Sequence, residues 1–160
     1  MSSSLLAHAA LVLATFTVAM LAGRRSDPDP SPEWSPAEVI RLQVEALQHN
    51  DTPHPDAGIA TAYRFASPGN RAATGPLARF AAMVHGPTYR DLLNASQVDF
   101  GRIRVEGDRA VQEVTVIRPD GRRATFAFGL SRQADGPWAG CWMTDAVVPG
   151  LQAPSGTIRA

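Results

Sequence analysis

Four side chains between the first two predicted helices are of types that bind metal ions. His49, Asp51, His54 and Asp56 lie within eight residues of one another, and imidazole and carboxylate groups are common metal ligands. The prolines between them hold the segment extended and spread the side chains apart. We therefore keep the four residues only as weak candidates for a metal site. The preferred interpretation is a polar loop in which Asp56 caps the second helix.

A second group of residues is of the kind that an isomerase-like reaction needs. Such a reaction uses a carboxylate base at the wall of an apolar cavity and a hydroxyl donor for the developing oxyanion. Asp99 and Asp145 are the candidate bases, and Tyr63 is the candidate donor. Asp99 lies between two apolar residues of one strand and should face solvent, so Asp145 is the better candidate. The alternative for either carboxylate is a surface position or a salt bridge, and we predict no catalytic residue.

The remaining chemical candidates are a lone cysteine and a set of large apolar side chains. Cys141 has no recognisable partner base, so a small buried thiol is favoured over a nucleophile. The candidates for lining a cavity that holds an apolar small ligand are Tyr63, Phe65, Trp142 and Met143. Aromatic residues more often simply form core. No cofactor motif is present, and we predict no cofactor.

Length and charge limit the classes of protein that fit. The chain has 160 residues and a formal net charge of zero, which suits one domain with a leader segment. Without a basic field, nucleic acid is not an expected partner. The single cysteine excludes an internal disulfide and the cysteine patterns of zinc sites.

Residues 5–22 form a mostly apolar run that is long enough to be a membrane-span candidate. Arg24 and Arg25 follow directly, which favours an uncleaved N-terminal anchor whose C-terminal side stays in the cytoplasm. An export signal and an organelle transit segment are the alternatives. We divide the chain into a hydrophobic anchor or signal segment (1–23), a Pro/Asp-rich linker (24–34), a folded domain (35–149) and a flexible tail (150–160).

The domain begins with helical patterns. Ser35 and Glu38 form a capping box that starts a helix, which should end near His49. A second helix follows Asp56 and should stop before the predicted turn of residues 67–70. A third helix should begin at position 76 and end at 85–87, and residues 87–93 form one further short helix.

The hydrophobic period then changes from helical to alternating. Alternation over residues 98–105, 110–116, 124–130 and 138–148, separated by turns, predicts four antiparallel strands in a meander, with an irregularity at Gly101. Helices followed by strands indicate an α+β fold with the helices on one face of the sheet. The other face has Cys141, Met143 and Val147 opposite Trp142, so it should line a pocket or meet a second copy of the chain in a homodimer.

Five segments, taken in their order along the chain, resemble a known family. They are residues 35–39, 46–51, 65–68, 74–76 and 140–145. The sequence resembles a domain-of-unknown-function family that we place among the nuclear-transport-factor-two-like (cystatin-like), cone-shaped α+β folds. The resemblance implies a curved sheet wrapped round helices, often with an apolar cavity, and it implies no reaction.

Taken together, these observations predict a membrane-anchored or exported small domain. We expect it to bind an apolar small ligand or a partner protein without catalysing a reaction. A small cavity enzyme of the acid–base type is the competing interpretation.

Overall fold

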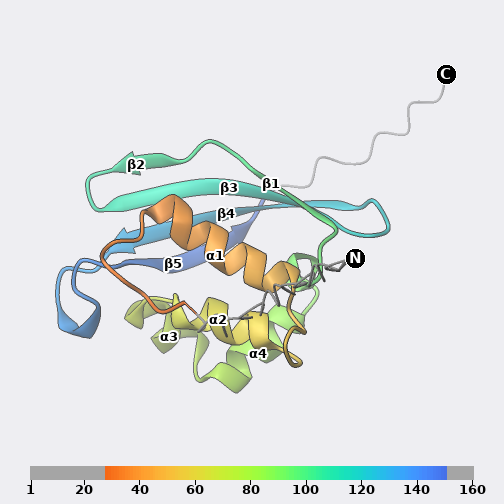
Figure 1. Cartoon of the computed structure of the whole chain (residues 1–160), viewed down its shortest axis with the longest axis horizontal. Helices are drawn as coiled ribbons and strands as arrows, with labels where there is room; N and C mark the ends of the chain where they lie inside the picture. Colours follow the sequence, from red (N-terminus) through yellow and green to blue (C-terminus); the bar gives the residue numbers. More distant parts are fainter. Residues whose placement is uncertain (1–27, 151–160) are drawn as a thin grey trace, which may run out of the picture.

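A layer of helices lies against one face of an antiparallel sheet in the computed structural model, which describes residues 28–150 (Figure 1). The helices are α1 (Pro36–Gln48), α2 (Ala57–Arg64), α3 (Pro68–Thr74) and α4 (Leu77–His85), with short 3-10 turns η1 (Arg90–Leu92) and η2 (Gly136–Trp138). The strands are β1 (Gln97–Phe100), β2 (Arg104–Glu106), β3 (Arg109–Ile117), β4 (Arg123–Arg132) and β5 (Trp142–Pro149). The predicted α+β class is confirmed.

The start of α1 is fixed by its own side chains. Ser35 Oγ accepts a hydrogen bond from the backbone N–H of Glu38 at 3.3 Å, and the Glu38 carboxylate accepts from the Ser35 N–H at 2.8 Å. This is the predicted capping box, and it satisfies two N–H groups that the helix itself leaves unpaired. The hydrogen bonds to Ser35, first from its side chain and then from its backbone, lower the pKa of Glu38.

The predicted turn at residues 67–70 is instead the start of a helix. Ser67 is the N-cap of α3, and its hydroxyl accepts from the N–H of Asn70 at 3.2 Å. Pro68 takes the first helical position, where its fixed φ favours a helix and its missing N–H costs nothing. The pair Ser67-Pro68 therefore begins a new helix instead of forming a simple turn. Pro76 is correspondingly the N-cap of α4 and not its first residue.

The sheet is an antiparallel meander in the order β1-β3-β4-β5, with β2 also paired to β3. The predicted first strand is interrupted between Phe100 and Arg104, which gives five strands where four were expected. Gly101 lies at the interruption, and its N–H donates to the carbonyl of Glu113 at 2.8 Å. A Cβ at position 101 would lie 3.0 Å from that carbonyl oxygen, so the close approach favours glycine.

A β-bulge in β5 changes which residues face the helices. Gly129 pairs with Ala146 and Leu130 pairs with Thr144, so Asp145 has no partner on β4. The extra residue brings both Thr144 and Val147 to the side where Leu130 and Phe128 face the core. The predicted grouping of Val147 with Cys141 and Met143, opposite Trp142, is therefore wrong.

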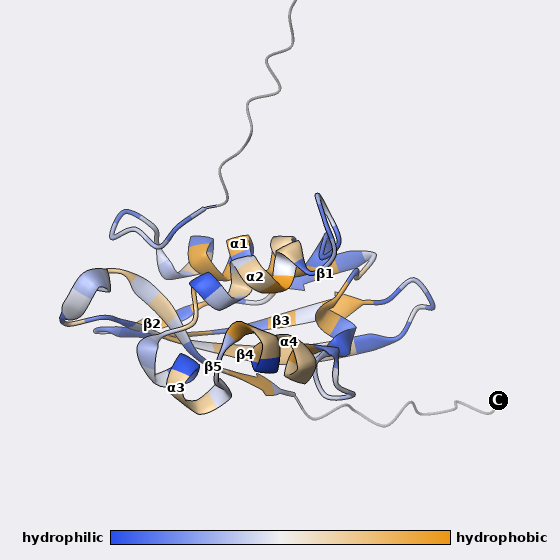
Figure 2. Cartoon of the chain, turned by 90° about the horizontal axis from the view of Figure 1, so that it is seen from below, coloured by the Kyte–Doolittle hydropathy of each residue, from blue (hydrophilic) through white to orange (hydrophobic). Residues whose placement is uncertain are grey.

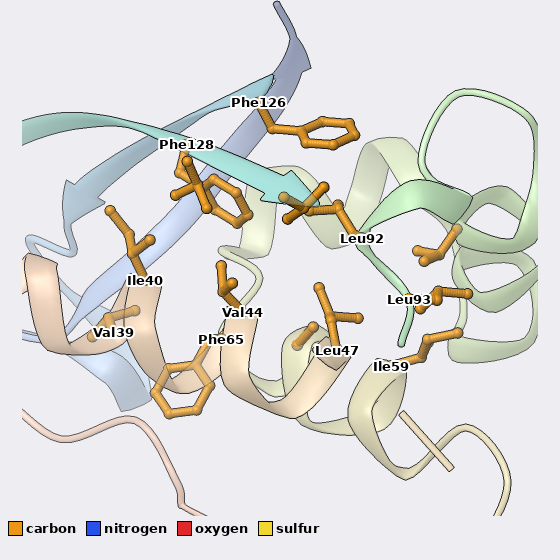
Figure 3. Packing of buried hydrophobic residues seen from close by; sticks show 14 of the residues in the cluster. Val39, Ile40, Val44, Leu47, Ile59, Phe65, Leu92, Leu93, Phe126 and Phe128 are labelled. Atoms are coloured by element: carbon orange, nitrogen blue, oxygen red, sulfur yellow. The ribbon is translucent and has the colours of Figure 1, made fainter. Parts of the chain in front are cut away.

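The core lies between the helices and the inner face of the sheet (Figure 3). Figure 3 shows side chains of α1, such as Ile40 and Val44, together with Phe128 of β4 and Leu92 of η1. Helix α2 approaches α1 closely, since the N–H of Gly58 donates to the carbonyl of Asn50 at 3.0 Å. None of the helices within residues 28–150 is long and apolar enough to cross a membrane. The predicted anchor, residues 5–22, lies outside that range.

Candidate ligand pocket

A pocket of about 220 Å³ opens between the helical layer and β5. All four helices, η1, β4 and β5 contribute to its lining. Helix α3 lies beside β5 at this end of the sheet (Figure 2), and Asn70 Nδ2 donates to the carbonyl of Thr144 at 3.0 Å. The pocket therefore lies where the helices meet the edge strand of the sheet.

Most of the pocket wall is apolar and belongs to the core. The apolar side chains that line it and are themselves buried are Leu47, Ala62, Ala66, Phe80, Val84, Leu92 and Phe128. They come from elements that lie far apart in the sequence and converge because each presents its apolar face to the sheet. Such a wall favours an apolar guest.

Two polar side chains interrupt the buried part of this wall. Gln43 and Thr144 are 3% and 2% exposed. Gln43 Nε2 donates to Thr144 Oγ1 at 2.8 Å, and Thr144 Oγ1 donates back to Gln43 Oε1 at 3.1 Å. Gln43 Nε2 also donates to the carbonyl of Val39 at 3.1 Å, which fixes the orientation of the amide. The buried end of the pocket therefore holds a neutral amide–hydroxyl unit whose N–H and O–H donors are all paired.

The main chain of Thr144 is held as firmly as its side chain. Its N–H donates to the carbonyl of Phe65 at 2.8 Å, and its carbonyl accepts from the N–H of Ser67 at 2.9 Å. The short segment around Ala66 thus forms a parallel bridge along the edge of β5. This bridge holds Thr144 at the position where it lies opposite Leu130 and faces the pocket.

The mouth of the pocket is exposed. Its exposed lining residues are Ala73, Met83, Asp145 and Ala146. Half-buried Tyr89 also lines the pocket, and its hydroxyl donates to the carbonyl of Val147 at 3.2 Å. A guest would enter past a carboxylate and reach the buried, neutral pair of Gln43 and Thr144.

The four residues predicted to bind a ligand do not line this pocket. Phe65, Trp142 and Met143 are each at most 3% exposed and are not among the pocket-lining residues. Tyr63 packs its ring against Phe80 with centroids 5.2 Å apart, and its hydroxyl donates to the carbonyl of Gly75 at 3.1 Å. Alternation alone could not place Val147 on the pocket side, because the bulge at Asp145 reverses the pattern after Thr144. One signal was available: Gln43 lies within the apolar stripe of α1.

The two candidates for acid–base chemistry are placed differently by the fold. Asp145 is at the exposed mouth of the pocket, whereas Tyr63 is not part of its lining. Asp99 is exposed on β1 and pairs with Thr115 on the face away from the helices. The pocket therefore brings one candidate carboxylate to an apolar wall without the predicted hydroxyl donor.

The candidate metal ligands in the loop between α1 and α2 form hydrogen bonds with other groups of the protein. Asp56 accepts a hydrogen bond from Asn50 Nδ2 and lies 2.9 Å from His85 Nε2. The carboxylate of Asp56 makes no capping hydrogen bond to α2, so the predicted cap is wrong. His49 Nδ1 lies 2.9 Å from the carbonyl of Glu45, and His54 Nδ1 lies 3.1 Å from that of Pro55. Within residues 28–150, no group of three or more His, Cys, Asp or Glu side chains is arranged to hold a metal ion.

Asp51 and buried Asn50 organise the same loop. Asp51 accepts hydrogen bonds from the side chains of Asn94 and Asn50 and from the N–H of Asp56. The bond from Asn94, followed by that from the Asp56 N–H, holds the pKa of Asp51 below its usual value. Asn50 is 1% exposed, and its Oδ1 accepts from the N–H of Ile59 at 3.0 Å. These contacts join the end of α1 to the start of α2.

Cys141 is buried, and burial raises the pKa of its thiol. A raised pKa keeps the thiol protonated and unreactive near neutral pH. The described surroundings of Cys141 thus fit a packing role.

Comparison with known proteins gives one match. Neither the curated proteins nor the solved structures include one that matches this chain. A family model described as a domain of unknown function (DUF4864) matches residues 35–148, which span α1 to β5 and every residue of the pocket. The chain therefore belongs to this family of domains of unknown function, DUF4864.

Proposed function

We propose that this domain binds a small, mostly apolar molecule in the pocket between the helices and β5, without catalysing a reaction. The observation that carries the proposal is the cavity of about 220 Å³ with a largely apolar, buried wall. An engineered apolar cavity of about 150 Å³ in another protein is large enough to bind benzene. A guest about the size of one substituted six-membered ring therefore fits.

The direct test compares retained mass in the full chain and in two matched variants. Ala73→Trp places a large ring at the pocket mouth, and Ala72→Trp places the same ring on the neighbouring exposed position of α3, which does not line the pocket. Native mass spectrometry of gently purified protein should show a mass above that of the chain for wild type and Ala72→Trp. The extra mass should be absent from Ala73→Trp.

A second measurement covers a ligand that is lost during purification. Ethylbenzene, titrated into the full chain and followed by NMR, should perturb signals of the pocket lining and bind more weakly to Ala73→Trp. The proposal fails if no extra mass is found and ethylbenzene does not bind at millimolar concentration.

The acid–base enzyme remains the alternative proposal. Asp145 at the pocket mouth is the carboxylate that such an enzyme would use. Asp145→Asn would abolish turnover of a carbonyl substrate in that case, and it would leave simple binding nearly unchanged if the domain only binds.

Two further proposals concern an N-terminal membrane anchor and the fold class of the domain. The apolar run of residues 5–22 with Arg24 and Arg25 behind it supports an N-terminal membrane anchor, with export or an organelle as alternatives. Retention of the full chain in the membrane pellet after alkaline washing tests this. For the fold, we propose the nuclear-transport-factor-two-like class, which the helices-then-meander order supports.

A homodimer through the outer face of the sheet is the proposed partner interaction. Val111 and Val148 are 38% and 56% exposed there, and small residues lie between them, since Val111 pairs with Gly129 and Val148 with Ala127. Light scattering should show a dimer that Val148→Arg dissociates, and a monodisperse monomer at high concentration would refute it.

A further inference from the structure

We propose that the natural ligand of this pocket is an uncharged apolar alcohol whose hydroxyl donates a hydrogen bond to the buried pair of Gln43 and Thr144. The inference rests on the proposed ligand-binding function and specifies the chemistry of the ligand. It follows from which hydrogen-bonding positions the protein has already used at the buried end of the pocket.

The donors of this pair are all occupied. Gln43 Nε2 has two N–H groups, which donate to Val39 O at 3.1 Å and to Thr144 Oγ1 at 2.8 Å. The single hydroxyl proton of Thr144 is directed to Gln43 Oε1 at 3.1 Å. What remains is one lone pair on each oxygen, so the pair can accept a hydrogen bond and has none left to donate.

The donors nearer the mouth are also largely engaged. Thr74 Oγ1 donates to the carbonyl of Asn70 at 2.9 Å, and the Tyr89 hydroxyl donates to the carbonyl of Val147 at 3.2 Å. Asn70 Nδ2 uses one N–H on the carbonyl of Thr144, and its second N–H lies on a half-buried residue that water can reach. A ligand carbonyl at the buried end would therefore find no donor and would lose its hydrogen bonds to water.

Charge narrows the choice further. Within residues 28–150, the pocket lining contains no Arg, Lys or His, so an anionic head group would be buried without a cation from this part of the chain. Among residues 28–150, the only charged lining residue is Asp145, which follows Thr144 directly in the chain and is exposed at the mouth. A protonated amine at the buried end would likewise find no buried carboxylate among these lining residues. A neutral hydroxyl is the head group that loses least on entering.

Four probes with one carbon skeleton separate these possibilities. They are ethylbenzene, which has no polar group, 1-phenylethanol, acetophenone and 1-phenylethylamine. The alcohol and the ketone share one carbon skeleton and one oxygen atom and differ in whether that oxygen carries a proton to donate, so their ratio of affinities reports the missing donor. With one neutral hydrogen bond at stake, wild type should bind the alcohol about 3- to 10-fold more tightly than the ketone. The amine should bind more weakly than the alcohol.

The matched variant is Gln43→Leu, which keeps the side-chain size and frees the Thr144 proton. That proton can then donate to a ketone, so the affinity ratio of alcohol to ketone should fall to about 1. Binding of ethylbenzene to the variant confirms an intact pocket. If Gln43→Leu does not fold, the wild-type ratio alone decides the inference.

Each outcome has a distinct meaning. A ketone or amine that binds wild type as tightly as the alcohol overturns the inference, and so does an alcohol preference that persists in Gln43→Leu. If ethylbenzene and the other probes all fail to bind wild type, the inference is overturned, and the proposed ligand-binding function fails as well when no extra mass is retained. Titrations followed by NMR on the full chain give all these affinities.

Discussion

Replacing Gly58 by alanine should destabilise the domain, although glycine-to-alanine changes usually strengthen a helix. Gly58 is buried in the first turn of α2. A Cβ at this position would lie 2.1 Å from the carbonyl oxygen of Ala46 and 2.9 Å from the Cα of Asn50. Both are backbone atoms of the chain around the end of α1, so no side-chain rotation relieves the contact. Helix α2 must therefore move away from α1.

The size of the effect follows from that movement. The new contact is short by roughly 1 Å, and overpacking of this kind costs about 1–3 kcal/mol. The shift also strains the hydrogen bonds from the N–H groups of Gly58 and Ile59 to Asn50, both 3.0 Å, for about 1 kcal/mol more. The better helix propensity of alanine returns about 1 kcal/mol. The net loss is about 1–3 kcal/mol, or a fall in Tm of about 4–12 °C at roughly 4 °C per kcal/mol.

Gly69→Ala is the matched control. Gly69 is the second residue of α3 as Gly58 is of α2, but a Cβ there would meet only Ser67 Oγ, at 3.9 Å. This variant should be unchanged or more stable by up to about 1 kcal/mol. Thermal melts of the full chain measure both. A Gly58→Ala protein with a Tm equal to or above that of wild type would contradict the close packing of α1 on α2.

Three other outcomes are expected. Asn50→Ala should cost about 2–3 kcal/mol in denaturant unfolding, because the buried N–H of Ile59 loses its acceptor; a loss below about 0.5 kcal/mol would contradict this. The pKa of Asp51 is lowered chiefly by the hydrogen bond from Asn94, so its stabilising contribution is present above the ordinary value of 3.8 and is lost as the pH falls through the folded-state pKa. Asn94→Gly, which keeps the positive φ of 53°, should therefore lose less stability than wild type on acidification from about pH 5 to about pH 2, and equal losses would refute the assignment. Burial raises the pKa of Cys141, so a thiol reagent near pH 8 should label native protein far more slowly than unfolded protein, and equal rates would exclude a buried thiol.

The parts of the fold that were predicted from sequence are those set by local chemistry. The capping box of Ser35 and Glu38 determines the start of α1 whatever the rest of the chain does. The strong turn at residues 119–121 and the alternation in 124–130 likewise specify the hairpin of β3 and β4. Where two local signals compete, as at Ser67 and Pro68, the same residues suit a turn or a helix start, and tertiary contacts to Thr144 accompany the helix.

The candidate pocket depends on features that local chemistry does not encode. Asp145 has no distinctive sequence signal, yet the bulge there reverses the sides of β5 on either side of it. The size and aromatic character of Tyr63, Phe65 and Trp142 predict ligand contacts, but large aromatic side chains more often pack together in the core. In the structure, Phe65 and Trp142 are buried in the core and Tyr63 packs against it.

Polar residues carry the stronger signal, because a buried amide must find a partner. Gln43 lies where the apolar stripe of α1 requires a buried side chain, and its amide can be satisfied only by a helix carbonyl and one further group. Thr144 supplies that group, because it lies opposite Leu130 on the inner face of the sheet, and the edge contacts of residues 65–67 hold it there. Helix α1, the bulged strand and the bridge at Ala66 are thus mutually dependent. The same pairing that stabilises the fold determines which hydrogen bond the pocket still offers to a guest.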